Sequence, residues 1–223
     1  MEIKLVILQT NRLKEMKEFY VNLFGFPLIK EDNKSFRMAV GSSELEFTEK
    51  HVEGNPFYHF AFNIPSNQFQ EAKAWVKERV ELNVEDGEDE AYFSFFSAHA
   101  LYFYDPAGNI VEFISRQTSV EGGRPFSIES VLNISEIGLT VDDAIRAGNR
   151  LIEKGIRERD NNPLSQTSLN FMGERSKGIY MILNQPGRRW IFSDKISAIY
   201  PIEVYTADGK QVVVTSEKKF KVY

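Results

Sequence analysis

The chain has 223 residues, of which 42% are hydrophobic and 13% aromatic, and its formal net charge is −5. This composition is typical of a folded globular protein. Acidic and basic residues are mixed along the sequence without a basic stripe, which argues against a nucleic-acid partner. No apolar run is long enough to cross a bilayer and the first residues lack a secretory signal pattern. We therefore expect a cytoplasmic protein with no membrane partner.

Cysteine is absent, and only three histidines occur, His51, His59 and His99. The absence of cysteine excludes thiolate catalysis, disulfides and thiolate metal sites. Any metal ion must therefore be bound by His, Asp or Glu side chains.

Residues 1–50 read as one βαβββ unit. A strand is predicted at residues 5–9, and Asn11 is placed to cap a helix whose apolar residues follow helical spacing to residue 23. Strands are then predicted at residues 36–40 and 44–48.

Residues 57–117 repeat this pattern. A strand at 59–64 precedes a helical stripe from residue 69 to residue 80. Strands are predicted at residues 92–96, 100–104 and 110–114. The last two flank Asp105-Pro106-Ala107-Gly108-Asn109, whose proline and glycine are typical of a hairpin turn.

A polar linker at residues 118–127 precedes a third, degenerate unit at 128–223. It contains a predicted strand at 136–141 and a helix that Gly155 ends. Further strands are predicted at residues 168–172, 179–183 and 190–193, and an Asp208-Gly209 turn indicates a C-terminal hairpin.

One such unit cannot bury both faces of its sheet, but two units side by side can, with helices outside and the other sheet face curled around a cleft. We therefore predict an α+β fold in which paired βαβββ modules, residues 1–50 and 57–117, form a curled mixed sheet with a central cleft in one domain of residues 1–117. Ferredoxin-like folds mix strands and helices similarly, so periodicity leaves that alternative open.

Three polar residues interrupt apolar strands: Glu46, His59 and Glu112. Each has apolar neighbours of the opposite parity, so all three face the cleft if the apolar set packs on the helices. One histidine with two carboxylates suits an open site for a borderline or hard divalent metal ion. The alternatives are solvated carboxylates on strand faces and a histidine that is satisfied within the core.

Several motifs carry a resemblance to a known family. They are Phe19-Tyr20, Phe24-Gly25-Phe26, Glu44-Leu45-Glu46-Phe47, His59-Phe60-Ala61-Phe62 and Asp105-Pro106-Ala107-Gly108-Asn109-Ile110-Val111-Glu112. With these motifs the chain resembles the vicinal oxygen chelate superfamily, which includes glyoxalase I, bleomycin-resistance proteins, fosfomycin-resistance enzymes and extradiol dioxygenases. The resemblance covers the first half of the chain well and the third unit only in outline.

Glyoxalase I-like members of that superfamily bind a metal ion through four residues at equivalent strand positions. The resemblance carries three of them over, Glu46, His59 and Glu112, whereas Leu5 occupies the first position. Tyr102 matches a catalytic tyrosine of extradiol dioxygenases, with packing as its alternative role. His99 is too close to Glu112 to complete the dioxygenase pattern.

The resemblance implies a divalent metal ion, with Ni, Zn, Fe and Mn as candidates, in an enzyme that acts on a small oxygenated or aromatic substrate. A lyase or isomerase of glyoxalase type is favoured over an extradiol dioxygenase, with Glu46 as metal ligand or general base. The alternative is a metal-free small-molecule-binding protein of bleomycin-resistance type. Leu5 and the aromatic residues Phe36, Tyr102 and Tyr104 favour this alternative.

In the third unit, alignment of the opening strand places Glu136 where His59 lies in the second unit. The closing stretch, residues 187–191, has no acid at the position of Glu112. Two roles stay open for this unit, covering a sheet edge and pairing with a second subunit in a homodimer. A contribution of Glu136 to the first cleft also stays open.

Overall fold

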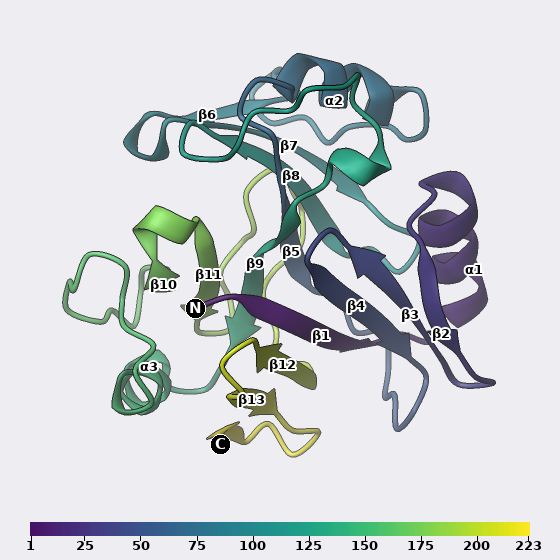
Figure 1. The fold of residues 1–223 in the computed structure, drawn as a ribbon. Coiled ribbons are helices and arrows are strands. Elements are labelled where there is room, and N and C mark those ends of the chain that lie inside the picture. Colours follow the sequence, from purple (N-terminus) through teal and green to yellow (C-terminus); the bar gives the residue numbers. More distant parts are fainter.

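The computed structural model describes residues 1–223 and contains two seven-stranded mixed sheets (Figure 1). The first sheet has the order β14 (Phe220–Val222), β13 (Gln211–Val214), β12 (Ile202–Thr206), β1 (Ile3–Gln9), β4 (Ser43–Thr48), β3 (Ser35–Val40) and β2 (Leu28–Glu31). The second has the order β10 (Asn170–Glu174), β11 (Ile179–Asn184), β9 (Asn133–Thr140), β5 (His59–Ile64), β8 (Ile110–Arg116), β7 (Ala98–Tyr104) and β6 (Ala91–Phe93). The predicted α+β class with curled mixed sheets is confirmed.

The helices are short. They are α1 (Leu13–Lys17), which continues as the π-helical segment η1 (Glu18–Leu23), α2 (Phe69–Lys77) and α3 (Ala144–Glu153), with single 3₁₀ turns η2 (Ser94–Phe96), η3 (Ile128–Ser130) and η4 (Arg175–Lys177). Helix α1 lies beside the first sheet and α2 beside the second, whereas α3 contacts both, through β14 of the first sheet and through β10 and β11 of the second (Figure 1). None of the helices has the length and apolar character needed to span a bilayer.

The pairing of the units differs from the expected pairing of residues 1–50 with 57–117. Strands β1–β4 share the first sheet with the C-terminal strands, because β1 pairs with β12. Strands β5–β8 share the second sheet with the third unit, because β5 pairs antiparallel with β9. The cleft of the second sheet is therefore formed by the second and third units.

One apolar core of 43 buried residues contains side chains from both sheets and all three α-helices. Strand β5 shows how this core orients the site. Phe60 and Phe62 belong to the core, whereas Ala61 belongs to a separate apolar cluster on the other face of the sheet. Because side chains alternate along a strand, His59 shares the face of Ala61.

Residues 190–193 are not a strand, so that prediction is wrong. The only ladder contact of this stretch is an isolated bridge between Arg189 and Ile196, and the chain turns back on itself between them without joining either sheet. They belong instead to a loop that follows β11 and reaches the cavity of the second sheet.

The turn at residues 105–109 is held by a buried hydrogen-bond network centred on Asp105. Its carboxylate accepts hydrogen bonds from the Tyr20 hydroxyl (2.8 Å), from the backbone N–H groups of Ala107 and Asn109 (3.0 Å each) and from the Asn109 side-chain amide (2.7 Å). Asn109 Oδ1 in turn accepts from the backbone N–H of Tyr58 at 2.7 Å. Gly108 supplies the positive φ of +79° that the turn requires. The motif therefore joins the helical segment η1 to the second sheet.

This network predicts a dependence of stability on pH. Burial outweighs the hydrogen bonds and raises the pKa of Asp105 from 3.8 to about 6. The folded protein therefore retains this proton over a range where the unfolded chain has lost it, so the associated stability is present below about pH 4 and is lost as the pH rises through about 6. Relative to Asp105→Asn, we expect the wild type to lose about 2–3 kcal/mol of unfolding free energy across that range. Urea denaturation of both proteins at each pH measures the difference, and a difference that does not change with pH would contradict the expectation.

Candidate metal centre

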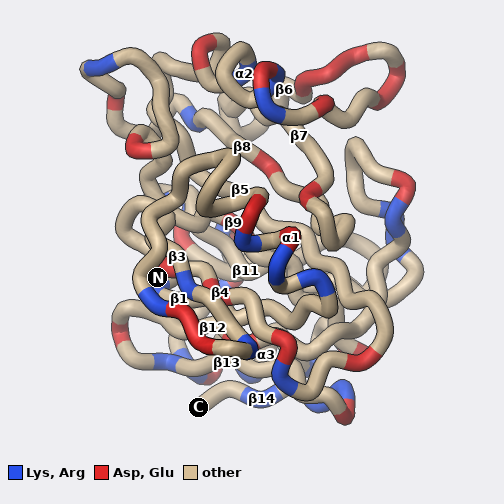
Figure 2. The backbone as a smooth tube through the Cα atoms, turned by 90° about the vertical axis from the view of Figure 1, so that its right-hand side faces the viewer, with Lys and Arg blue, Asp and Glu red and all other residues tan.

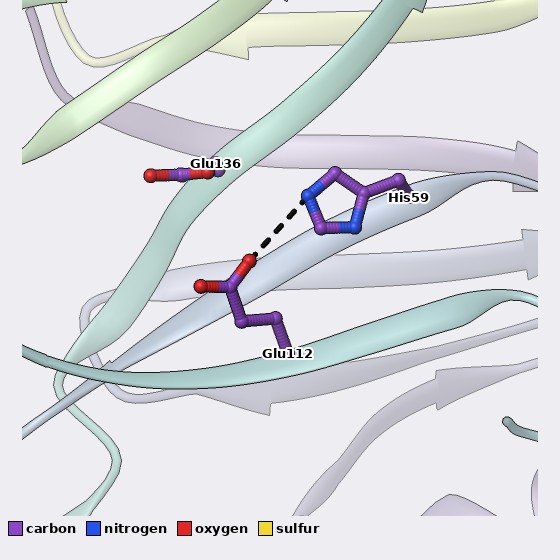
Figure 3. A group of neighbouring side chains, drawn as sticks. All are labelled: His59, Glu112 and Glu136. Atoms are coloured by element: carbon purple, nitrogen blue, oxygen red, sulfur yellow. Dashed lines mark ion pairs between the residues drawn. The ribbon is translucent and has the colours of Figure 1, made fainter. Parts of the chain in front are cut away.

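Three neighbouring strands in the middle of the second sheet bring His59, Glu112 and Glu136 together (Figure 3). Ala61 of β5 lies opposite Glu112 of β8 on one side and opposite Glu136 of β9 on the other. His59 lies two residues before Ala61 and thus projects from the same face. The small alanine side chain leaves room between the two carboxylates.

The three side chains are close and almost fully buried. Their potential ligand atoms all lie within 4.8 Å of one another. His59 Nε2 lies 3.5 Å from Glu112 Oε2, the contact that is dashed in Figure 3. The exposed fractions are 5% for His59, 2% for Glu112 and 6% for Glu136, so solvent does little to stabilise their charges.

Hydrogen bonding determines which nitrogen of His59 faces the cluster. The Nδ1 atom lies 3.1 Å from the carbonyl oxygen of Ile110, which is a hydrogen-bond acceptor. Burial lowers the pKa of His59, so the ring is neutral and its single proton resides on Nδ1. Nε2 therefore presents a lone pair to the two carboxylates, as it does in metal-binding histidines that are oriented through their other nitrogen.

The electrostatics of the cluster fit a cation. Burial raises the pKa of Glu112 well above its ordinary value, and the neighbouring Glu136 raises it further. One neutral histidine and two carboxylates form a mixed nitrogen and oxygen donor set that suits Zn, Fe, Mn or Ni. A divalent ion among these atoms would offset the repulsion that disfavours ionised Glu112.

Arg116, at the end of β8, forms a buried ion pair with Glu136. Its Nη2 donates to Glu136 Oε1 and its Nη1 donates to Asn63 Oδ1. Gly178, at a φ of +60°, makes room for this arginine, because an added Cβ would lie 2.8 Å from Arg116 Cδ. One oxygen of Glu136 is thus engaged by arginine and the other stays free to act as a ligand.

A cavity of about 360 Å³ lies against the cluster, and the cluster residues form part of its lining. Most of the remaining lining is apolar and includes Phe93, Phe96, Tyr102, Phe171, Ile182 and Trp190. Tyr102 lies directly opposite Glu112 across β7 and β8. Burial, with a further contribution from Glu112, raises the pKa of Tyr102 well above its ordinary value, so its hydroxyl stays protonated.

The structure does not bring Glu46 to this cluster. Glu46 lies on β4 of the first sheet, opposite Ile7 of β1, and forms an ion pair of 2.8 Å with Arg37. Leu5, at the position of the missing fourth ligand, also lies on β1. Of the aromatic residues expected to line a binding cavity, Tyr102 lines this one. Phe36 packs in the main core, and Tyr104 lies outside the cavity lining and donates a hydrogen bond to Asp194 at 2.7 Å.

The residues that complete the site differ in how far the sequence indicates them. Glu136 was detectable, because its strand aligns with the strand of His59. Arg116 had no signal, since a single arginine at the end of a strand does not reveal its buried partner. Trp190 carries an aromatic side chain into the cavity from a segment that was expected to be a strand.

Acidic and basic residues are mixed along the chain. Figure 2 shows both Lys and Arg and Asp and Glu along the side of the molecule that faces the viewer. Such a distribution does not provide the basic stripe that typical nucleic-acid interfaces present.

Comparison with known proteins identifies the family. A family model described as Glyoxalase/Bleomycin resistance protein/Dioxygenase superfamily matches residues 2–113, which is half of the chain. The chain therefore belongs to this superfamily. A second model, described as Toxoflavin-degrading enzyme, matches residues 134–188. No curated protein matches the chain.

Solved structures show similarity to about half of the chain. A lactoylglutathione lyase from Agrobacterium tumefaciens is 20% identical, with a TM-score of 0.42 over 50% of this chain and 90% of that chain. A glyoxalase/bleomycin resistance protein/dioxygenase from Nocardioides is 20% identical, with a TM-score of 0.43 over 57% of this chain and 89% of that chain. A protein of the same description from Alicyclobacillus acidocaldarius is 14% identical, with a TM-score of 0.42 over 52% and 92%.

Proposed function

We propose that His59, Glu112 and Glu136 bind a divalent metal ion and that the protein is a metal-dependent enzyme acting on a small oxygenated or aromatic substrate. The observation that carries this proposal is the convergence of three buried ligand atoms within 4.8 Å against a cavity. The metal ligands inferred from the resemblance are thereby revised, with Glu136 in place of Glu46.

A metal ion bound here would polarise a substrate oxygen as a Lewis acid. The residues of the chain supply the rest of the chemistry. The hydrogen bond to Ile110 holds the His59 ring in its ligand orientation, and Arg116 holds Glu136. Tyr102 keeps its proton and can donate a hydrogen bond to a substrate oxygen beside Glu112. The aromatic walls exclude water and offer flat surfaces to a planar substrate.

The match of residues 134–188 to the toxoflavin-degrading enzyme model makes toxoflavin the first candidate substrate. This range contains Glu136, nearly all of β9, the whole of β11, and Arg188, which lines the cavity. A glyoxalase-type lyase or isomerase reaction is the other class that superfamily membership supports.

Metal analysis of the purified protein tests the proposal. We expect one divalent ion per chain after incubation with Mn, Fe, Zn or Ni salts, and consumption of toxoflavin by the loaded protein, monitored through its absorbance. The Glu112→Ala variant should lose both, because the vacated position offers no ligand and leaves only His59 and Glu136. A wild-type protein that retains none of the four metals after dialysis would disprove metal dependence.

A metal-free binding protein is the second candidate. The Arg116–Glu136 ion pair favours it, because one of the two carboxylates is already neutralised without a metal ion. Treatment with a chelator separates the candidates. If toxoflavin binds and its affinity is unchanged by the chelator, the protein is a metal-free binder, whereas loss of binding supports the metal-dependent enzyme.

A further inference from the structure

The loop after β11 is a self-contained hairpin that forms one wall of the cavity. At its base, Gly187 N–H donates to the Ser197 carbonyl at 2.9 Å and Ser197 N–H donates to the Arg188 carbonyl at 2.7 Å. Nearer its tip, Trp190 N–H donates to the Lys195 carbonyl at 3.0 Å. Because these bonds lie within the loop, they can persist while the loop moves as a unit.

Two aromatic side chains of this hairpin pack against residues of the site, Trp190 against His59 and Phe192 against Tyr102. The Trp190 ring lies 4.8 Å from the His59 ring. The Phe192 ring stacks on Tyr102 at 4.9 Å with an angle of 14° between the ring planes. Gly138 of β9 leaves the space for the indole, since a Cβ at that position would lie 2.9 Å from Trp190. The indole of Trp190 therefore packs directly on the backbone of β9 at Gly138.

The tip of the hairpin is tied to the α2–β6 connection by Glu85 and Asn83. One carboxylate oxygen of Glu85 accepts from Arg189 Nη2 and the other accepts from the backbone N–H of Phe192. Asn83 Nδ2 donates to the Phe192 carbonyl at 2.8 Å. Both backbone polar groups of Phe192 are thus bound by side chains of another segment.

The closed position of the tip depends on those contacts. Phe192 has a φ of +52°, a left-handed backbone conformation that phenylalanine rarely adopts. Such a conformation persists only where the surroundings impose it. Arg189 is half-exposed, so its ion pair is weakened by solvent, and the bonds to the Phe192 backbone are the stronger part of the attachment.

We propose that residues 188–196 form a lid over the cavity and that Glu85 is the positioning residue that latches it closed. Opening breaks the bonds of Glu85 to Phe192 and Arg189 together with the weaker neutral bond of Asn83 to Phe192 and the two hydrogen bonds between Tyr104 and Asp194 (2.7 and 3.1 Å). The hairpin then swings away as a unit and Trp190 leaves its position beside Gly138. Ligands then enter the cavity beside His59, and closure excludes water from it. The lid proposal does not depend on the metal proposal, because none of the contacts described for the lid involves a metal ion.

Fluorescence of Trp190 tests the latch in the full chain. The sequence has two tryptophans, so Trp75→Phe leaves Trp190 as the single emitter. In this background we expect Glu85→Ala to raise lid opening at least about tenfold, as loss of a hydrogen bond to a charged group should. Acrylamide quenching of Trp190 and amide hydrogen exchange of residues 188–196 should both increase. Glu88→Ala is the matched control, since Glu88 lies in the same connection and forms no ion pair.

A conservative variant distinguishes the latch from a general loss of structure. Glu85→Gln keeps an acceptor for the Phe192 N–H but loses the charge, so it should fall between wild type and Glu85→Ala, and it carries the test if the alanine variant does not fold. Exchange of the β5 and β8 amides should stay unchanged in each variant. If quenching and exchange of the lid residues equal those of Glu88→Ala, the hairpin is a fixed wall and the proposal is overturned.

Discussion

Replacing Arg116 with methionine should lower the free energy of unfolding of the metal-free protein by about 3–5 kcal/mol at neutral pH. Arg116 and Glu136 form an ion pair in which the side chains are only 4% and 8% exposed. Removal of the arginine leaves a carboxylate that is buried without its cationic partner, and that state is far costlier than the pair or than an apolar replacement of both residues. Urea denaturation of wild type and Arg116→Met measures the loss.

Two further variants serve as controls. Arg116→Met combined with Glu136→Leu should recover most of the lost stability, because no charge then remains buried. Arg37→Met removes two ion pairs of the first sheet, with Glu44 and Glu46, in which the arginine side chain is 26% exposed, and it should cost no more than about 1 kcal/mol. If Arg116→Met alone lowers the free energy of unfolding by less than about 1 kcal/mol, the ion pair with Arg116 is not required to stabilise buried Glu136.

Metal affinity should distinguish Glu136 from Glu46. Glu136→Gln should weaken Mn²⁺ binding by about a hundredfold or more, because it replaces a negatively charged ligand, and changes in residues that merely support ligands already cost 10- to 100-fold. Glu46→Gln should leave the affinity nearly unchanged, since Glu46 lies in the other sheet and contacts Arg37. Titration calorimetry with Mn²⁺ measures both variants.

Glu46→Gln is a suitable comparison for Glu136→Gln because both residues are carboxylates on strands in the interior of their sheets. Glu136→Asp serves as an intermediate variant that keeps the charge but shortens the reach of the ligand. Equal affinities in wild type and Glu136→Gln would exclude Glu136 as a ligand, and a loss confined to Glu46→Gln would restore the assignment made from the sequence.

The elements of the fold were largely predictable from the sequence, but their pairing was not. Alternation of apolar residues indicated β5 and β8, and the Asp105–Asn109 turn indicated the hairpin between β7 and β8. Alternation describes which face a residue occupies, whereas the pairing of β5 with β9 depends on which strand edges meet. Because the three units share the same order of strands and helix, the sequence does not indicate which two units pair in one sheet.

The candidate site was likewise predictable within one unit but not between units. His59 and Glu112 could be selected because each interrupts an apolar strand within one unit, where the local pattern fixes their relative positions. Glu46 has the same local pattern but lies in the unit that joins the other sheet. Glu136 could be noticed by alignment, but its approach to His59 depends on contact between two units, which no single-strand pattern encodes.

The position of β1 has a consequence for the order in which the protein folds during synthesis. Strand β1 lies between β4 and β12, so the first sheet needs segments from the beginning and the end of the chain. The second sheet contains only residues 59–184 and can be completed earlier. While the ribosome is still making residues 202–214, one side of β1 has unpaired backbone groups that other chains could recruit. Until β12 is made, β1 is therefore an edge strand that can pair with other chains.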